Sequence, residues 1–447
     1  MSRNYFPGSM LLALSLTGSC VFAATETAAD DPQKPKQDSV WVKLATADVP
    51  FRSERDVLSP AIFDRSAWNV VEFPQDGTAV DLKLPHEGKG KDGKPAPALM
   101  GAVPGAGFVW LDLNGDGKRG HDEITPFAAD KPARTFTWGA SYEDGTSGTI
   151  VFKLVDIGEP YKAAIVRMGM KQTKLGATTI FLIDDNGNGR YDDLFRDIVM
   201  IPGEPLVYLS RQIYLGNVLH EILVHPAGQT VEVRPLPTLP KGTVHIFNAY
   251  KPSHKAENLR IHTLIITGKE GAFAFDSKRP SLEVPVGAYD LVYGLFQRGS
   301  DLESSEWVVL KKGERTSFNV EAAAITTPAW GEPVEAKFTI EQDGKHITVG
   351  PPKFVGKAGE VYQPFSYKKN NVSAFLTQIW YDKRMNNLAR YEPRASHKFD
   401  IQPNNELKPV IFEWMKHDEM QVSIEYKSGI LGVVLTKEKF LFIAKKK

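Results

Sequence analysis

The sequence predicts an all-β (mainly β) protein with several domains. Short runs rich in β-branched and aromatic residues recur along the chain, and glycine, proline and asparagine bound them, as is typical of strands. The two best helix candidates, 59–68 and 193–197, are short enough to be single turns. Roughly 400 residues beyond the leader exceed what one hydrophobic core serves, so we expect about two to four domains.

The N-terminus has the pattern of an export signal. The apolar run Met10–Leu16 is too short to span a bilayer but fits the core of a signal peptide. Small residues in Val21-Phe-Ala23 predict cleavage after a signal peptide over 1–23. Alternatively, Leu16-Thr-Gly-Ser-Cys20 resembles a bacterial lipobox and predicts a lipid anchor at Cys20. Both alternatives predict a secreted, periplasmic or cell-envelope protein.

Composition excludes several classes of protein. Cys20 is the only cysteine, so the mature domains contain no thiol for disulfides, zinc–cysteine clusters or a cysteine nucleophile. The 54 basic and 54 acidic residues balance, which leaves no overall field to attract nucleic acid or an anionic membrane. We expect no transmembrane helix in the mature chain.

Proline-rich segments predict the domain boundaries. Proline lacks the amide donor that a central strand needs, so 234–242 and 326–333 are expected to be linkers. The predicted order is a signal peptide (1–23), a flexible spacer (24–39), a β-rich domain (40–235) and two β-sandwich modules (242–326 and 333–447).

The middle module contains a familiar strand pattern. Val284-Pro-Val-Gly-Ala-Tyr289 resembles the closing strand of the prealbumin-like or immunoglobulin-like modules appended to secreted bacterial proteins. The resemblance implies small sandwiches that serve display or interaction. Their partner would be a cell-surface or extracellular protein or polysaccharide.

Two loops have oxygen-bearing side chains at alternate positions followed by glycine. They are Asp112-Leu-Asn-Gly-Asp-Gly117 and Asp184-Asp-Asn-Gly-Asn-Gly189. Ca²⁺ takes about six to eight oxygen ligands, and a loop with side chains at positions 1, 3 and 5, a carbonyl at 7 and a carboxylate at 12 can wrap it. An ordinary Asn-Gly or Asp-Gly hairpin turn explains the glycines but neither the alternation nor a carboxylate at position 12.

The first loop contains a complete candidate ligand set. It comprises Asp112, Asn114, Asp116, the carbonyl of Lys118 and a bidentate Glu123. The spacing resembles the EF-hand calcium loop, although Arg119 occupies the usual aliphatic position 8 and the flanks are strand-like. The resemblance therefore covers the loop and not the helix–loop–helix fold, as in secreted bacterial β proteins with EF-hand-like calcium loops.

The second loop lacks a carboxylate at position 12, which is Phe195. Its earlier ligands would be Asp184, Asn186, Asn188 and the Arg190 carbonyl. The last carboxylate must come from Asp192, Asp193 or, by folding back, Asp197. Fewer anionic ligands weaken calcium binding, so we expect the first site to be the tighter one.

The sequence thus predicts an exported calcium-binding β protein with a structural or interaction role, and more readily a non-enzyme than an enzyme. The alternative is a secreted hydrolase of polysaccharide or peptide with structural calcium, because a catalytic carboxylate pair can be far apart in sequence.

One histidine motif invites a zinc-peptidase interpretation. His220 and His225 flank Glu221, but their interval differs from the usual four residues, and Ile222–Val224 favour a strand. In a strand the two imidazoles would point to opposite faces and could not share a metal.

Overall fold

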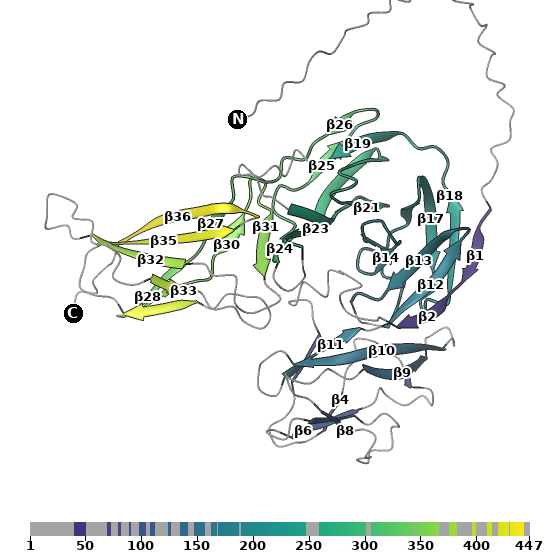
Figure 1. Ribbon diagram of the computed structural model, residues 1–447, viewed down its shortest axis with the longest axis horizontal. Coiled ribbons are helices and arrows are strands. Elements are labelled where there is room, and N and C mark those ends of the chain that lie inside the picture. Colours follow the sequence, from purple (N-terminus) through teal and green to yellow (C-terminus); the bar gives the residue numbers. More distant parts are fainter. Residues whose placement is uncertain are drawn as a thin grey trace, which may run out of the picture. The chain divides into compact units, whose positions relative to one another are not determined.

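Strands form throughout the part of the chain that the structure describes, and the prediction of a mainly β fold is confirmed (Figure 1). The computed structural model describes side chains in 40–49, 169–186, 189–246, 259–300, 305–344 and 346–364, at 409–411, 430, 431 and 434, and elsewhere the backbones of strands. No helix occurs in these described residues, and so none of them forms an apolar helix long enough to cross a membrane. The predicted signal peptide and spacer lie outside the described residues.

Two antiparallel sheets enclose the region of the second loop. One sheet has the order β1 (Val42–Ala45), β18 (Thr230–Pro235), β17 (Val218–Val224) and β16 (Gln212–Leu215). The other has the order β15 (Val207–Tyr208), β14 (Ile198–Met200), β13 (Thr178–Ile183), β12 (Gly169–Leu175) and β2 (Ala47–Pro50). Ile180, Leu182 and Val199 of the second sheet share a buried core with Ile222 and Val231 of the first.

The largest sheet packs on the other side of β13 and β14. Its order is β21 (Ala272–Phe275), β20 (Leu259–Thr267), β23 (Gly287–Arg298), β24 (Glu306–Lys311), β31 (Val361–Phe365), β30 (Lys353–Val355) and β27 (Glu335–Lys337), and β25 (Phe318–Val320) also pairs with β23. Because β24 pairs with β31, strands from both sides of the proline-rich segment 326–333 belong to one sheet.

Both faces of this sheet are buried around β24. Trp307 and Val309 pack in a core with Ile183 and Ile198, whereas Val308 and Leu310 belong to the core on the opposite face. Successive side chains of a strand point to opposite faces, so a strand covered on both sides is a continuous apolar run.

The remaining described strands form five smaller sheets. Two have the orders β22 (Ser281–Pro285), β19 (Lys241–His245), β26 (Ile325–Thr326), and β28 (Ile340–Asp343), β29 (His346–Val349), β34 (Val410–Glu413). The last segment forms β33 (Ser396–Lys398), β32 (Phe375–Tyr381), β35 (Glu419–Ser428), β36 (Gly432–Leu441). Early strands form β3 (Asn69–Glu72), β11 (Lys162–Arg167), β10 (Ser147–Asp156), β9 (Thr135–Ser141), β5 (Lys89–Gly90), and also β4 (Ala79–Asp81), β6 (Ala98–Val103), β7 (Phe108–Leu111), β8 (Ile124–Pro126).

The local sequence predictions can be compared with these strands. Residues 193–197 form a single turn, closed by the Asp197 N–H donating to the Asp193 carbonyl over 3.0 Å. The helix candidate 59–68 lies outside the described residues. The strand prediction for the histidine motif is confirmed, since His220 lies in β17 and His225 follows the end of that strand.

Candidate metal centre

Both oxygen-rich loops connect antiparallel strands. The first loop runs from the end of β7 to the start of β8, which pair with each other, and the second runs from β13 to β14. An ordinary hairpin loop has about two to five residues, and both connections are longer than that. Asp112, Asn114, Asp116, Lys118, Glu123 and, in the second loop, Asn188 lie outside the described residues.

Two buried aspartates lie opposite each other at the base of the second loop, where the chain leaves β13 and enters β14. Ile183 of β13 pairs with Ile198 of β14, so Asp184 and Asp197 occupy the next register position beyond the ladder. Their exposed fractions are 0% and 1%. Like charges at directly opposed positions repel, and burial removes the water that would weaken this repulsion. Without a bound cation, ionisation of both Asp184 and Asp197 would therefore destabilise the folded protein.

Asp197 has a buried oxygen that accepts no hydrogen bond from any described residue. Its Oδ2 accepts the Asp193 N–H over 2.8 Å, but its Oδ1 has no donor among the described residues. Burial, then the charge of Asp184, raises the pKa of Asp197 to about 9; Asp193 and Asp185 add to the rise, and the hydrogen bond from the Asp193 amide opposes it. A buried polar atom without a partner is an exception in folded proteins and calls for an explanation such as a bound ion.

The last turn of the loop holds Asp197 in this position. Phe195 adopts a left-handed backbone conformation, with φ of 61°, which is uncommon for a residue with a side chain. Its N–H donates to the Leu209 carbonyl over 2.7 Å, and the Leu209 N–H donates to the Asp197 carbonyl over 2.7 Å. These bonds tie the turn to the chain that enters β16, so the position of Asp197 is set by tertiary contacts.

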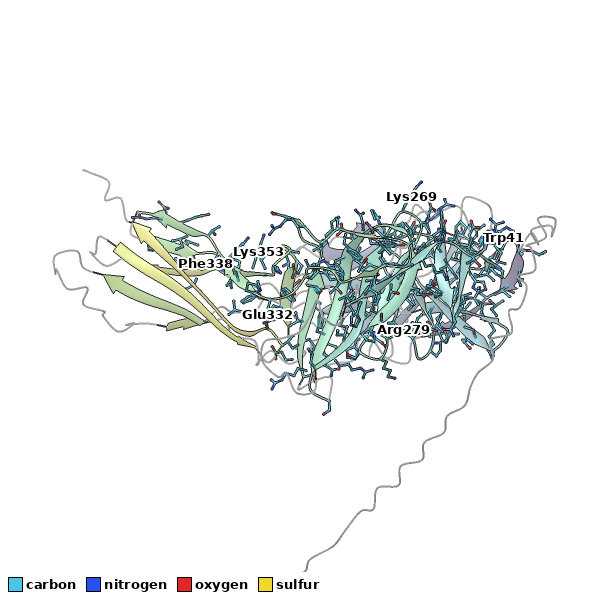
Figure 2. All side chains as sticks on the ribbon, turned by 90° about the horizontal axis from the view of Figure 1, so that it is seen from above. Trp41, Lys269, Arg279, Glu332, Phe338 and Lys353 are labelled. Atoms are coloured by element: carbon cyan, nitrogen blue, oxygen red, sulfur yellow. The ribbon has the colours of Figure 1, made fainter. Side chains whose placement is uncertain are left out.

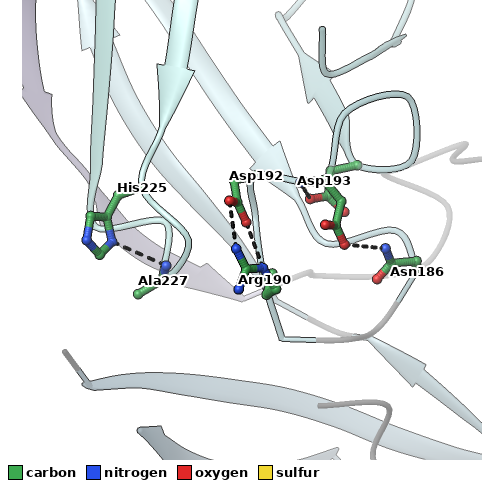
Figure 3. A network of polar contacts seen from close by, with 7 residues as sticks. Asn186, Arg190, Asp192, Asp193, His225 and Ala227 are labelled. Atoms are coloured by element: carbon green, nitrogen blue, oxygen red, sulfur yellow. Dashed lines mark hydrogen bonds and ion pairs between the residues drawn. The ribbon is translucent and has the colours of Figure 1, made fainter. Parts of the chain in front are cut away.

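The other predicted ligands of the second loop divide into two groups. Asp184 Oδ2 accepts the Gly189 N–H over 2.7 Å, and the Asn186 amide donates to Asp193 Oδ2 over 2.8 Å. Asp192 instead forms a two-pronged ion pair with the Arg190 guanidinium, at 3.0 Å and 2.9 Å (Figure 3). The structure thus links Asp184, Asn186, Asp193 and Asp197 within the loop and gives Asp192 a different partner.

Tyr191 anchors the middle of the loop to the β17–β18 turn. Its side chain is 1% exposed, and its N–H donates to the Pro226 carbonyl over 2.9 Å. Gly228 lies against the aromatic ring, where an added Cβ would be 2.8 Å from Tyr191 Cδ2. In the same turn, the Ala227 N–H donates to His225 Nδ1 over 3.3 Å (Figure 3). The loop is therefore fixed at a point between Asn186 and Asp193.

Glu123 of the first loop and Asp197 of the second have the same position relative to the strand that follows each loop. Glu123 immediately precedes β8, and Asp197 immediately precedes β14. Counting from Asp184 places Phe195 at position 12, but counting back from the second strand places Asp197 where the first loop has Glu123. The apolar run 198–200 was the signal in the sequence that could have singled out Asp197.

In their present rotamers these side chains do not yet form a metal cage. Among the described residues, no group of three or more His, Cys, Asp or Glu side chains is arranged to hold a metal ion. The Asn186 amide nitrogen faces Asp193, so its oxygen would have to turn toward a cation.

No protein-family model matches the chain, and no curated protein is similar to it in sequence.

Proposed function

We propose that the protein is an exported calcium-binding β protein in which Ca²⁺ braces the loops between paired strands. The observation that carries the proposal is the buried pair Asp184 and Asp197, with the Asp197 Oδ1 lacking a donor among the described residues. A hard divalent cation would neutralise both carboxylates and occupy the partner position of that oxygen. An ordinary hairpin turn explains neither feature.

The ligands of the second site would come from both arms of the loop. Asp184, Asn186, Asp193 and Asp197 would supply side-chain oxygens, and Asn188 and the Arg190 carbonyl take the remaining positions by sequence. The first loop would use Asp112, Asn114, Asp116, Glu123 and the Lys118 carbonyl in the same way. Glu123 supports this extension because it has the same place before its strand as Asp197.

Calcium would act by making the loops rigid. The second loop is hydrogen-bonded to Leu209 and Pro226, which lie in connections to β16 and β18 respectively. A ligand that binds only the folded state adds its binding free energy to stability, so an ion here would stabilise both facing sheets. In an exported protein, weak affinity of about 10⁻⁴–10⁻³ M suffices for such a structural role.

Calorimetric titration of the full chain with CaCl₂ tests the proposal, together with the melting temperature in EGTA and in excess Ca²⁺. We expect binding at two sites, and a stabilisation of about 2.7 kcal/mol at a hundredfold excess over the dissociation constant of a site. Absence of both heat and thermal shift in the wild-type protein would overturn the proposal.

Matched aspartate variants assign the second site. Asp197→Asn should remove one of the two binding events, whereas Asp192→Asn should keep both, because Asp192 is held by Arg190. Asp112→Ala combined with Asp116→Ala should remove the tighter event. Equal effects of the Asp197 and Asp192 substitutions would contradict the ligand assignment.

A further inference from the structure

A cleft of about 670 Å³ lies between the end of β24 and the β27–β30–β31 edge of the large sheet. Five cationic side chains line it: Lys312, Arg315, Lys337, Lys353 and Lys357. Its acidic lining residues are Glu314 and Glu335. The chain as a whole is electrically balanced, but this cleft concentrates positive charge that the overall composition hides.

Two of these lysines are held side by side without an acidic partner. Lys337 of β27 pairs in register with Lys353 of β30, so their side chains project from the same face. Both are exposed, and neither they nor Lys357 form an ion pair with any described residue. Like charges directly opposite each other cost stability. A bound anion would offset that cost.

A buried carboxylate, Glu360, orders the turn that forms one wall of the cleft. Glu360 is 0% exposed and accepts the Gly331 N–H over 2.6 Å, the Ala358 N–H over 2.9 Å and the Tyr362 hydroxyl over 3.1 Å. These bonds fix the turn that carries Lys357, whose own N–H donates to the Gly331 carbonyl. The cations therefore project from an ordered frame and not from a loose surface loop.

A second contact ties the opposite wall to the same turn. The Arg315 N–H donates to the Ala358 carbonyl over 2.9 Å, and its guanidinium donates to the Lys357 carbonyl over 3.1 Å. Lys312 is the exception among the five, because its ammonium pairs with Asp290. Four of the five cations are thus available to a ligand that enters between the walls.

We propose that this cleft binds an acidic polysaccharide, with its carboxylate or sulfate groups placed among Lys337, Lys353, Lys357 and Arg315. Its volume is that of an ordinary ligand site, and spread lysine charges suit a chain of separate anionic groups. No aromatic side chain is among the described residues that line the cleft, so these residues offer no stacking platform of the kind that single-stranded nucleic acids use. The export signal also favours an extracellular polymer.

Binding of a fluorescent heparin oligosaccharide to the full chain tests this proposal, measured by anisotropy over a range of NaCl concentrations. Alginate serves as the carboxylate competitor, inorganic tripolyphosphate as the small-anion competitor, and oligo(dT) as the nucleic-acid competitor. We expect heparin binding that weakens steeply with salt and competition by alginate. Competition by oligo(dT) or tripolyphosphate as strong as that by unlabelled heparin would overturn the assignment to a polysaccharide.

Charge-reversal variants locate the binding site. Lys337→Glu combined with Lys353→Glu should weaken heparin binding about tenfold or more, which corresponds to about 1.4 kcal/mol. The matched control is Lys269→Glu with Lys278→Glu, which changes the net charge equally at exposed positions outside the cleft (Lys353 and Lys269 are labelled in Figure 2). Equal losses in both double variants, or no heparin binding by the wild type, would overturn the proposal.

The single substitution Lys353→Glu tests whether weaker heparin binding could result from misfolding. Lys353→Glu replaces a like-charge pair across β27 and β30 with an opposite-charge pair. We expect this variant to melt at or above the temperature of the wild type while binding heparin more weakly. Unchanged heparin binding by this variant would contradict the proposed role of Lys353.

Discussion

Asp193 and Asp197 are joined by two reciprocal hydrogen bonds. The Asp197 N–H donates to the Asp193 carbonyl over 3.0 Å, and the Asp193 N–H donates to Asp197 Oδ2 over 2.8 Å. The pair closes the last turn of the second loop, directly before β14. Within this turn the Asp197 carboxyl group both caps the backbone and lies buried beside Asp184, whose charge helps to raise the pKa of Asp197 to about 9.

These two roles of Asp197 can be separated by substitution in metal-free buffer. Asp197→Asn keeps an oxygen acceptor for the Asp193 N–H and removes the cost of protonating a buried carboxyl group at neutral pH, whereas Asp197→Ala leaves that amide without its acceptor. We expect the Asn variant to be more stable than the wild type in EGTA, and more stable than the Ala variant by about 1–3 kcal/mol. Urea unfolding followed by fluorescence measures both differences. An Asn variant less stable than the wild type would mean that the ion-free loop tolerates the second buried carboxyl group without cost.

Gly228 is predicted to be more sensitive to substitution than another glycine with a similar backbone. Gly228 has φ of 65° and Gly176 has φ of 58°, but only at Gly228 would a Cβ meet the Tyr191 ring and Lys171, whereas nothing lies within 4 Å of one at Gly176. Gly176→Ala should therefore cost about 1–2 kcal/mol for left-handed strain alone. Gly228→Ala should cost clearly more in urea unfolding and should weaken calcium binding at the second loop. Equal costs for the two variants would show that the contact with Tyr191 is unimportant.

His262 should make stability depend on pH. The imidazole stacks on Trp307 with ring centroids 5.1 Å apart and contacts the Gln297 amide oxygen. Burial lowers the pKa of His262 below its ordinary value of 6.5, and Arg260 acts in the same direction, while Gln297 and Asp276 oppose them. Below about pH 6.5 the unfolded chain therefore binds a proton that the folded chain still excludes, so the free energy of unfolding falls as the pH drops.

The pH effect of His262 can be measured by comparing urea unfolding at pH 7.5 and pH 5.5. His262→Gln should reduce the difference in unfolding free energy between the two pH values. The exposed His346 provides the control, and His346→Gln should leave the difference in place. The opposite ranking of the two variants would contradict the assignment to His262.

The buried Glu360 should be more sensitive to substitution than the carboxylates that line the cleft. Both of its oxygens accept hydrogen bonds, so in Glu360→Gln one N–H or O–H donor would face the amide nitrogen. We expect a loss of about 2–4 kcal/mol in urea unfolding. Glu314→Gln, at an exposed position of the same cleft, should change stability by less than about 0.5 kcal/mol. A mild effect of the Glu360 substitution would show that the frame of the cleft does not depend on this network.

Sequence patterns were sufficient for the fold class and for the location of one candidate site. Runs rich in β-branched and aromatic residues predicted a mainly β fold, and the spacing of oxygen-bearing side chains identified Asp184 and Asn186 as candidate ligands. Local patterns succeed here because a strand and the loop that follows it are adjacent in sequence. They left Asp192, Asp193 and Asp197 as alternatives for the last carboxylate, because nothing local distinguishes them.

The structure gives these three carboxylates different surroundings. The Ile183–Ile198 pairing places Asp197 opposite Asp184, and Leu209 fixes the final turn from outside the loop, whereas Asp192 pairs locally with Arg190. The cationic cleft has the same origin, since its lysines come from three separate segments that strand pairing brings together. The sequence by itself determined which side chains the loops and strands carry, whereas only the tertiary structure decided which charges meet, because burial and strand register act between residues far apart in the chain.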